Sequence, residues 1–156
     1  GGACEPLLAL NEVVAHKLDI ARLIEMETFV DGRLMSRQRC DGMVVATPTG
    51  STAYALSGGG PIVHPGVDAM VVVHIAPHTL TSRPVVVSLD TQVEIVVQTE
   101  RAGEVQITCD GQVGRELNPG DTLQVKRYPK PLRLIHPKGH DYFATVRAKL
   151  YWGRET

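Results

Sequence analysis

A series of short apolar segments in the second half of the chain constrains the fold more than any other feature. Between residues 69 and 127 these segments read AMVVVHIAP, RPVVVSL, QVEIVVQTE, EVQITCDGQ and DTLQVKR. Turn residues separate them, for example Arg101-Ala102-Gly103 and Asn118-Pro119-Gly120-Asp121. Because β-branched side chains favour strands, and short strands at regular spacing are typical of sandwiches, this half predicts an antiparallel β-sandwich.

The first half of the chain predicts further strands. The segment PLLALNEVVAH reads as one strand, which the polar pair Asn11-Glu12 interrupts. Apolar side chains then alternate at period two before a turn at Asp31-Gly32, which indicates a hairpin. The alternating residues are Ile24, Met26, Thr28 and Val30. The MVVA segment that begins at Met43 predicts a short buried strand.

Two helices complete the predicted fold. The polar stretch TPTGSTAYALSGGGP follows the MVVA strand, and the Ser51 or Thr52 hydroxyl is expected to cap a short helix that ends at Gly58. In the tail DYFATVRAKLYWG, apolar residues fall at helical spacing and predict a C-terminal amphipathic helix. The predicted fold class is mainly β: a single sandwich-like domain over residues 1–156, with one short helix and one C-terminal helix.

Length and composition exclude several classes of partner. The chain has 156 residues, the size of one domain, and can bury roughly two thirds of its unfolded surface. Its formal charge is −1, without long runs of one sign, which argues against nucleic-acid and membrane partners. Neither a membrane span nor a signal peptide is recognisable. Cys4, Cys40 and Cys109 are widely spaced and odd in number, which indicates a reducing compartment, and we expect the cytoplasm.

Three kinds of catalytic or metal site are disfavoured. His74 and His78 have the spacing of a helical zinc site, but Pro77 lies between them in a strand-like context. Ser51 and Ser57 lack the Gly-x-Ser-x-Gly pattern of a nucleophile elbow. The Gly-Lys-Ser/Thr ending of a phosphate-binding P-loop is also missing. Loop or edge positions are expected for the remaining histidines, which are His16, His64, His136 and His140.

Three polar segments remain as candidate binding elements. The stretch TPTGSTAYALSGGGP suits a polyhydroxylated or phosphorylated small molecule, although a plain turn also explains it. Asn11 and Glu12 can present an amide and a carboxylate to ribose hydroxyls, whereas a cross-strand salt bridge would also account for the glutamate. Arg39 and Asp41 precede the MVVA strand, where an ordinary Asp-Gly turn with a surface arginine is an equal explanation.

Taken together, these three segments resemble the NAD kinase family, in which they occur in the same order. LNEVV is followed by RCDG and TPTGSTAYALSGGGPIVHP, and HIAPHTLTSRPVVV, CDGQ, LIHP, DYF and KLYWG agree further along. The resemblance covers nearly the whole chain. It implies the mostly β C-terminal domain of an enzyme that phosphorylates the 2′-hydroxyl of the adenosine ribose of NAD to give NADP. The implied donor is ATP or polyphosphate, with a divalent metal such as magnesium.

The resemblance also implies a set of NAD-binding residues. Asn11 and Glu12 are similar to a pair that contacts the adenosine part of NAD, and Arg22 matches a less specific contact position. Arg39 and Asp41 resemble residues at the nicotinamide end. The implied adenine and ribose pocket comprises Thr49, Thr52, Ala53, Tyr54, Ala55, Leu56 and Ser57, with further contacts at Ala76 and Gln112. A neighbouring subunit often completes this pocket in the family, which implies a homo-oligomer.

One motif of the family is absent from the sequence. The family carries a Gly-Gly-Asp-Gly motif whose aspartate is implicated as the base, but here Gly1-Gly2 is followed by Ala3-Cys4. No catalytic residue and no metal ligand is therefore assigned, and the chain alone is expected to be inactive. In the family, this motif lies in an N-terminal α/β domain, and the C-terminal helix of this chain is expected to dock on such a domain. The alternative functions are a non-catalytic nucleotide-binding β module and a related lipid kinase, whose substrate needs an apolar channel.

Overall fold

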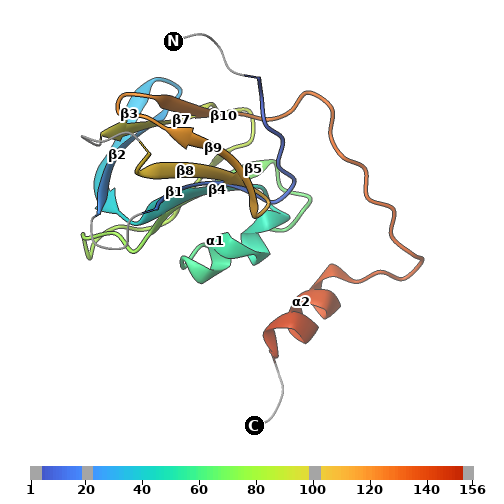
Figure 1. Cartoon of the computed structure of the whole chain (residues 1–156). Coiled ribbons are helices and arrows are strands. Elements are labelled where there is room, and N and C mark those ends of the chain that lie inside the picture. The colour runs from blue at the N-terminus through green and yellow to red at the C-terminus, as the bar shows by residue number, and fades with distance from the viewer. Residues whose placement is uncertain (1–4, 19–22, 99–102, 153–156) are drawn as a thin grey trace.

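The structure is a computed structural model that describes residues 5–18, 23–98 and 103–152, and it contains two antiparallel β-sheets (Figure 1). Within these residues, the first sheet has six strands in the order β6-β5-β4-β1-β8-β9. Their bounds are β1 Glu12–Lys17, β4 Gly42–Ala46, β5 Ala69–Ile75, β6 Val85–Ser88, β8 Val105–Cys109 and β9 Gln112–Leu117. The second sheet has the order β10-β7-β2-β3, with β2 Ile24–Val30, β3 Arg33–Cys40, β7 Val93–Gln98 and β10 Thr122–Val125.

The predicted mainly β fold is confirmed, and so is the hairpin of β2 and β3. Asp31 and Gly32 form its turn with φ angles of 49° and 72°, the left-handed conformation that Asp-Gly turns adopt readily. Strand β9 was not predicted. Its apolar residues Val113 and Leu117 are separated by glycine and charged residues, so the sequence lacks the clean alternation of a half-buried strand.

The prediction of a strand over PLLALNEVVAH is wrong in its first half. β1 begins only at Glu12, and residues 5–11 form no strand or helix. Leu7, Leu8 and Leu10 in this segment are at least 40% exposed, so their apolar character does not reflect burial within a strand. The polar pair therefore marks the start of a strand and not an interruption within one.

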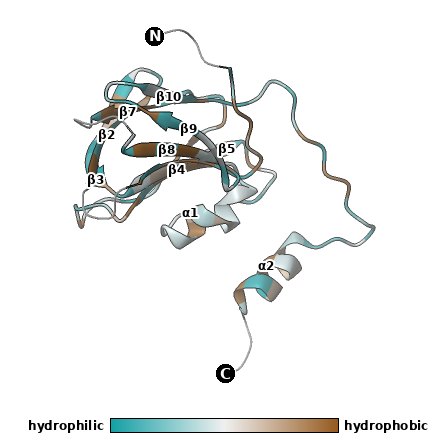
Figure 2. Ribbon diagram, in the orientation of Figure 1, coloured by the Kyte–Doolittle hydropathy of each residue, from teal (hydrophilic) through white to brown (hydrophobic). Residues whose placement is uncertain are grey.

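The main hydrophobic core lies between the two sheets. Ala15, Met43 and Val72 of the six-stranded sheet are fully buried against Met26 and Ile95 of the four-stranded sheet and their neighbours. Figure 2 shows the apolar strands, β8 among them, within the body of the molecule, whereas the two helices are more polar. Because aromatic residues are few, this core consists of aliphatic and methionine side chains together with Cys40.

A second, smaller core covers the outer face of the six-stranded sheet. The short helix α1, Tyr54–Ser57, and the loop that follows it lie against this face (Figure 1). Ala55 of α1 and Val63 of the loop pack on Val44, Val71 and Val73. Strands β4 and β5 are therefore buried on both faces, which explains their nearly continuous apolar sequences.

The short helix was predicted in the right place, but its predicted cap is wrong. A single 3₁₀ turn, Gly50–Thr52, precedes α1, and the N-cap residue Ala53 makes no side-chain capping bond. Ser51 is instead fully buried. Its hydroxyl donates to the Pro48 carbonyl at 2.6 Å and accepts from the Val63 N–H at 2.9 Å, which ties the loop before α1 to the loop after it.

The C-terminal helix α2, Tyr142–Leu150, is confirmed and lies apart from the sheets at the end of a long extended segment (Figure 1). Its N-cap is Asp141, whose carboxylate accepts from the backbone N–H groups of Phe143 and Ala144. Tyr142 contacts the ring of His64, with ring centroids 4.8 Å apart. Among the described residues, neither helix has the length and apolar character to cross a bilayer.

Met26 provides a test of the core between the sheets. Its side chain is fully buried, so Met26→Ala is expected to lower the free energy of unfolding by about 2–5 kcal/mol, because it leaves a cavity. Leu34→Ala on the same hairpin is the matched control, since Leu34 is 55% exposed and its loss should cost less than about 0.5 kcal/mol. Urea unfolding measures both. Equal losses in the two variants would contradict the assigned core.

Candidate nucleotide-binding site

The pairing of β1 brings three polar segments to one end of the six-stranded sheet. β1 is antiparallel to both neighbours, with Glu12 opposite Ala46 of β4 and Val13 opposite Cys109 of β8. The start of β1 therefore meets the ends of β4 and β8. The Asn11-Glu12 pair, the loop that begins at Thr47 and the turn at Asp110 consequently lie together, although up to 99 residues separate them in sequence.

Thr47 and Gly50 hold the backbone just before β1 from one side. The Thr47 hydroxyl donates to the Leu10 carbonyl at 2.7 Å, and the Thr47 N–H donates to the Asn11 carbonyl at 2.8 Å. Gly50 lies against the backbone of Asn11, and a Cβ atom at this position would overlap the Asn11 carbonyl oxygen. The loop sequence therefore requires glycine here for close approach of two backbones.

The Asp110 carboxylate holds the same segment by accepting from the N–H groups of residues 10–12. Its Oδ2 accepts from Leu10 N at 2.7 Å, and its Oδ1 accepts from Asn11 N at 2.7 Å and Glu12 N at 3.0 Å. Burial raises the pKa of Asp110. The three hydrogen bonds together lower the pKa by more than burial raises it, so the pKa lies below its ordinary value. The carboxylate is thus the form that the fold stabilises.

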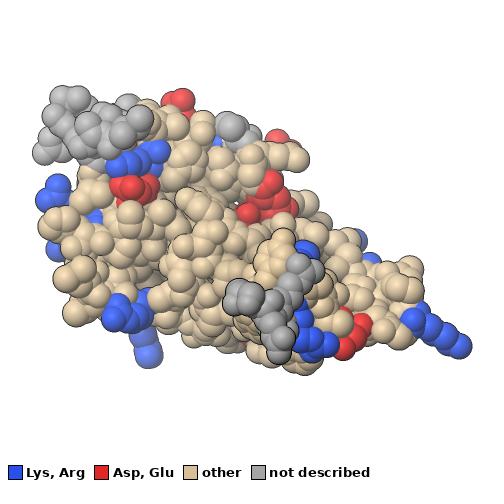
Figure 3. Space-filling model, turned by 90° about the horizontal axis from the view of Figure 1, so that it is seen from below, with Lys and Arg blue, Asp and Glu red and all other residues tan. Residues whose placement is uncertain are grey.

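A groove of about 460 Å³ opens on the outer face of the sheet beside α1. Glu12, Val14 and His16 line it from alternate positions of β1, so one face of this strand forms its floor. The other lining residues are Lys17, Asp41, Tyr54, Ile75, Thr108 and Gly111. Figure 3, which views the molecule from the side of the helices, shows acidic and basic side chains interspersed without a large patch of one sign.

Glu12 is the most unusual group in this groove. It is only 8% exposed, and its Oε2 atom has no hydrogen-bond partner among the described residues. Burial and, to a smaller extent, the nearby charge of Asp110 raise the pKa of Glu12 above its ordinary value. A buried, unpaired carboxylate oxygen costs stability, and this cost disappears when a ligand donates a hydrogen bond to it.

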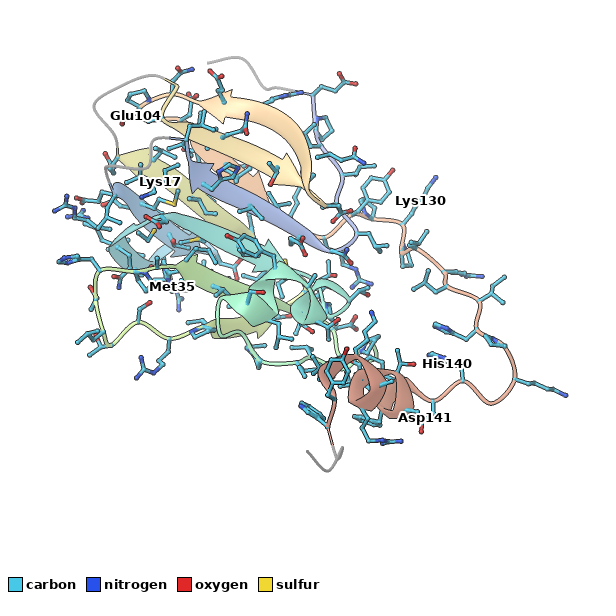
Figure 4. All side chains as sticks on the ribbon, turned by 60° about the horizontal axis from the view of Figure 1, so that its bottom comes forward. Lys17, Met35, Glu104, Lys130, His140 and Asp141 are labelled. Carbon is cyan, nitrogen blue, oxygen red and sulfur yellow. The ribbon has the colours of Figure 1, made fainter. Side chains whose placement is uncertain are left out.

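Lys17 and Asp41 lie together in the groove. The Lys17 ammonium and the Asp41 carboxylate are 2.5 Å apart, and the Lys17 N–H also donates to the Asp41 carbonyl at 2.9 Å. Lys17 extends from the end of β1 (Figure 4). The pair joins the strand that carries Glu12 to the turn before β4, and it places a neutralised carboxylate within the groove.

Only part of the predicted set lines this groove. Glu12, Asp41 and Tyr54 do so, and Gln112 follows directly after the lining residue Gly111. Asn11 is half-buried at the rim, held by Thr47 and Asp110. Partly or fully exposed positions around α1 and β5 belong to Thr49, Thr52, Ala53, Leu56, Ser57 and Ala76.

The three remaining predicted residues are Ala55, Arg39 and Arg22. The side chain of Ala55 is fully buried in the outer core. Arg39 lines a separate hollow of about 240 Å³ together with Glu25, Arg37, Gln38, His78 and Thr79. Arg22 lies outside the described residues.

Several lining residues were missed in the sequence. Val14 and His16 share the face of Glu12, and the period of two along β1 is the signal that would have found them. The expectation of a loop or edge position for His16 is wrong, because β1 is a central strand. Lys17, Ile75, Thr108 and Gly111 join the groove through strand pairing, for which no local signal exists.

The histidine pair considered for zinc has a different environment from a metal site. His74 lies on β5 and is buried, with Ser36 Oγ 3.2 Å from its Nε2 and Ser82 Oγ 3.4 Å from its Nδ1. Burial lowers the pKa of His74, which favours the neutral ring. His78 lies in the exposed loop after β5. In the described part of the chain, no cluster of three His, Cys, Asp or Glu side chains could hold a metal ion.

Bacterial proteins named NAD kinase match this chain over most of its length. It is 50% identical over 147 residues to a protein named NAD kinase from Nitrosococcus oceani, and 51% identical over 145 residues to one from Pseudomonas putida. These matches cover 94% and 93% of this chain, but 50% and 49% of the relatives. The chain therefore spans about half the length of the curated relatives it matches.

Solved structures with the same architecture are also named as kinases of this type. A yeast NADH kinase complexed with NADH superimposes with a TM-score of 0.86 at 26% identity, over 95% of this chain and 45% of that one. An NAD kinase from Archaeoglobus fulgidus in complex with ATP gives 0.70 at 32% identity, over 79% and 47%. The family model described as the ATP-NAD kinase C-terminal domain matches residues 10–137, and the chain belongs to this family.

Proposed function

We propose that this chain is the NAD-binding half of an NAD kinase, which phosphorylates the 2′-hydroxyl of the adenosine ribose of NAD to give NADP. The observation that carries the proposal is the groove beside α1, in which the buried Glu12 carboxylate has an oxygen without a partner among the residues that the structure describes. Ribose hydroxyls are donors that would satisfy it. The NADH in the yeast relative's structure supports a dinucleotide as the ligand.

Several groups in the groove suit the recognition of NAD. Glu12 accepts from ribose hydroxyls, and Tyr54, which is 43% exposed at the start of α1, offers a flat face for stacking on adenine. Asp41 accepts from the nicotinamide carboxamide at the far side of the groove. The proposed contacts also include Asn11, Arg22, Arg39, Thr49, Thr52, Ala53, Ala55, Leu56, Ser57, Ala76 and Gln112, with Ala55 contributing through its backbone.

The role of this chain in the reaction is to bind and orient NAD. The 2′-oxygen of the ribose forms a bond to the terminal phosphorus of ATP as the bond to the bridging oxygen breaks and ADP leaves. The hydroxyl proton passes to a base, and no Gly-Gly-Asp-Gly aspartate is present in this sequence to take it. Phosphoryl transfer also needs the donor and a divalent metal to be positioned, and we assign this role to the other half of the enzyme.

The extended segment and α2 are proposed to dock on that other half. Leu132, Leu134 and Ile135 are between 56% and 97% exposed, and Phe143 and Trp152 of the helical end are more than half exposed. Figure 4 shows Lys130 and His140 on this segment, well apart from the sheets. Apolar side chains of this number gain stability only when another surface covers them.

A homo-oligomer is proposed from the position of Arg39. This residue lines the second hollow and not the groove of its own chain, although Asp41 is only two residues away. Arg39 would therefore reach the dinucleotide bound to a neighbouring copy. We also propose a cytoplasmic location, which the free thiols of Cys40 and Cys109 support.

The first test of this function is NAD affinity. Tyr54→Ala and Asn11→Ala are each expected to weaken NAD binding in isothermal titration by on the order of 1 kcal/mol, about fivefold, through lost stacking or hydrogen bonding. Tyr128→Ala is the matched control, because Tyr128 is similarly exposed but lies on the extended segment. Unchanged affinity in both groove variants would place the binding site elsewhere.

The second test is NADP formation. With ATP and magnesium, this chain alone is expected to produce no NADP in a coupled assay, because it lacks the base. A chimera that joins the preceding half of the Nitrosococcus oceani relative to this chain is expected to produce it. A chimera that folds and binds NAD without forming NADP would favour a non-catalytic nucleotide-binding module.

The third test uses the pH dependence of Glu12. Because the pKa of Glu12 in the folded state is raised above the ordinary 4.5, the ionised carboxylate opposes folding, and this cost grows as the pH rises from the ordinary to the raised pKa. Glu12→Gln is therefore expected to increase the urea midpoint at pH 7 and to lose this advantage below about pH 4. The same variant should bind NAD more weakly. A lower midpoint at pH 7 would contradict the assignment.

A further inference from the structure

Asp110 lies in an Asp-Gly hairpin turn whose φ angles match those of the turn at Asp31. Asp31 and Gly32 have φ angles of 49° and 72°, and Asp110 and Gly111 have φ angles of 51° and 75°. Asp31 joins β2 to β3, whereas Asp110 joins β8 to β9. As turn residues alone, the two aspartates would be equivalent.

Their side chains differ in what they hold. The Asp31 carboxylate accepts one backbone hydrogen bond, from Gln92 N at 2.9 Å. The Asp110 carboxylate accepts three, from the consecutive N–H groups of residues 10, 11 and 12, at distances between 2.7 and 3.0 Å. These partners lie 98 to 100 residues away in sequence. The turn itself does not need these three bonds. Their effect is to hold the backbone of residues 10–12.

We propose that Asp110 is a positioning residue of the nucleotide groove, which fixes the backbone of Leu10, Asn11 and Glu12 so that the Asn11 and Glu12 side chains face the ligand. This inference rests on the proposed function, because it takes NAD to be that ligand. Asp110 binds the protein backbone and not the nucleotide.

The hydrogen bonds of this segment show why an anchor is required. β1 begins at Glu12, so residues 10 and 11 lie outside the strand. Thr47 binds the carbonyls of Leu10 and Asn11, and Asp110 binds the N–H groups on the other side. Without the Asp110 carboxylate, the N–H groups of residues 10–12 lose these partners, and the backbone that leads into Glu12 is held through its carbonyls alone.

The anchor also has an electrostatic consequence for Glu12. The Asp110 charge contributes to the raised pKa of Glu12, so the group that positions this carboxylate also opposes its ionisation. The groups around Glu12 that titrate or carry charge are His16, Lys17 and Asp41 along the groove, with Asp110 beside it. Neutralising Asp110 should therefore move the pH at which NAD binding is lost toward lower values.

Two substitutions at each turn distinguish the hydrogen bonds of the aspartate side chain from the role of the residue in the turn. Asp110→Gly removes all three hydrogen bonds and keeps a residue that adopts positive φ without strain. Asp110→Asn also tolerates this φ, retains a carbonyl oxygen for the N–H groups of Asn11 and Glu12, and removes the charge. Asp31→Gly and Asp31→Asn are the matched controls on the other sheet.

The expected results concern NAD affinity in isothermal titration of the full chain. Asp110→Gly should weaken binding about tenfold or more, and Asp110→Asn about threefold, since it keeps two of three bonds. Asp31→Gly should leave affinity within about twofold, although it also loses a backbone hydrogen bond of its turn aspartate. In the Asp110→Asn variant, the pH at which affinity is half lost should shift downward.

A coupling measurement distinguishes positioning from general weakening of the fold. If Asp110 acts through the two groove side chains, adding Asp110→Gly to a chain that already carries Asn11→Ala and Glu12→Gln should reduce affinity less than about twofold. A purely structural effect would again give the full tenfold loss. That full loss, or unchanged affinity in the Asp110→Gly single variant, would overturn the inference.

Amide hydrogen exchange keeps this inference separate from the proposed function. In the absence of NAD, Asp110→Gly should accelerate exchange at residues 10–12, whereas Asp31→Gly should not. Unaltered exchange at these amides would overturn the anchor even if NAD binds as proposed. An unsubstituted chain that binds no NAD would instead overturn the proposed function, while the exchange result would still decide whether Asp110 fixes this segment.

Discussion

The pairing of β1 on both of its edges is the constraint on which the rest of the molecule depends. Antiparallel registers with β4 and β8 place the start of this strand beside the ends of its two neighbours. The Asn11-Glu12 pair and the groups that hold it follow from that meeting point. The loop after β4 supplies Thr47 and Gly50, the turn after β8 supplies Asp110, and the chain entering β1 supplies Asn11 and Glu12. Changing either register would separate them.

The two faces of the six-stranded sheet have different roles: the inner face forms the main core, and the outer face carries the groove. The inner face packs on the second sheet and contributes Ala15, Met43 and Val72 to the main core. The outer face is closed by α1 over β4 and β5 but remains open along β1, and the groove lies there. Glu12 begins this open strip as a buried carboxylate, and its Oε2 has no partner in the described part of the chain. Burial of this oxygen without a hydrogen bond lowers the stability of the fold, and such a loss is expected at a binding site before the ligand binds.

Local patterns in the sequence predicted the fold well, and long-range contacts explain what they missed. The β2–β3 hairpin follows from period-two apolar residues around Asp31-Gly32, and α2 follows from helical spacing. β9 was missed because its charged residues hide the alternation. Ser51 was expected as a cap, but its partner Val63 lies twelve residues away in an unpredictable loop. Asp110 was not singled out, because its three partners lie 98 to 100 residues away in the sequence. Residue type and local context singled out Asn11, Glu12 and the stretch that contains Tyr54, and the resemblance assigned these residues to NAD. His16 and Thr108 required the strand pairing.

A crystal structure of this chain with NAD would test the central claim most directly, namely that the groove on the open face of β1 is the dinucleotide site. The account predicts the adenosine ribose in the groove, with a hydroxyl within about 3 Å of the Glu12 carboxylate and the adenine against Tyr54. The hydrogen bonds of Asp110 to residues 10–12 should be unchanged. Adenosine bound outside this groove, or ribose hydroxyls that leave Glu12 without a partner, would contradict the account.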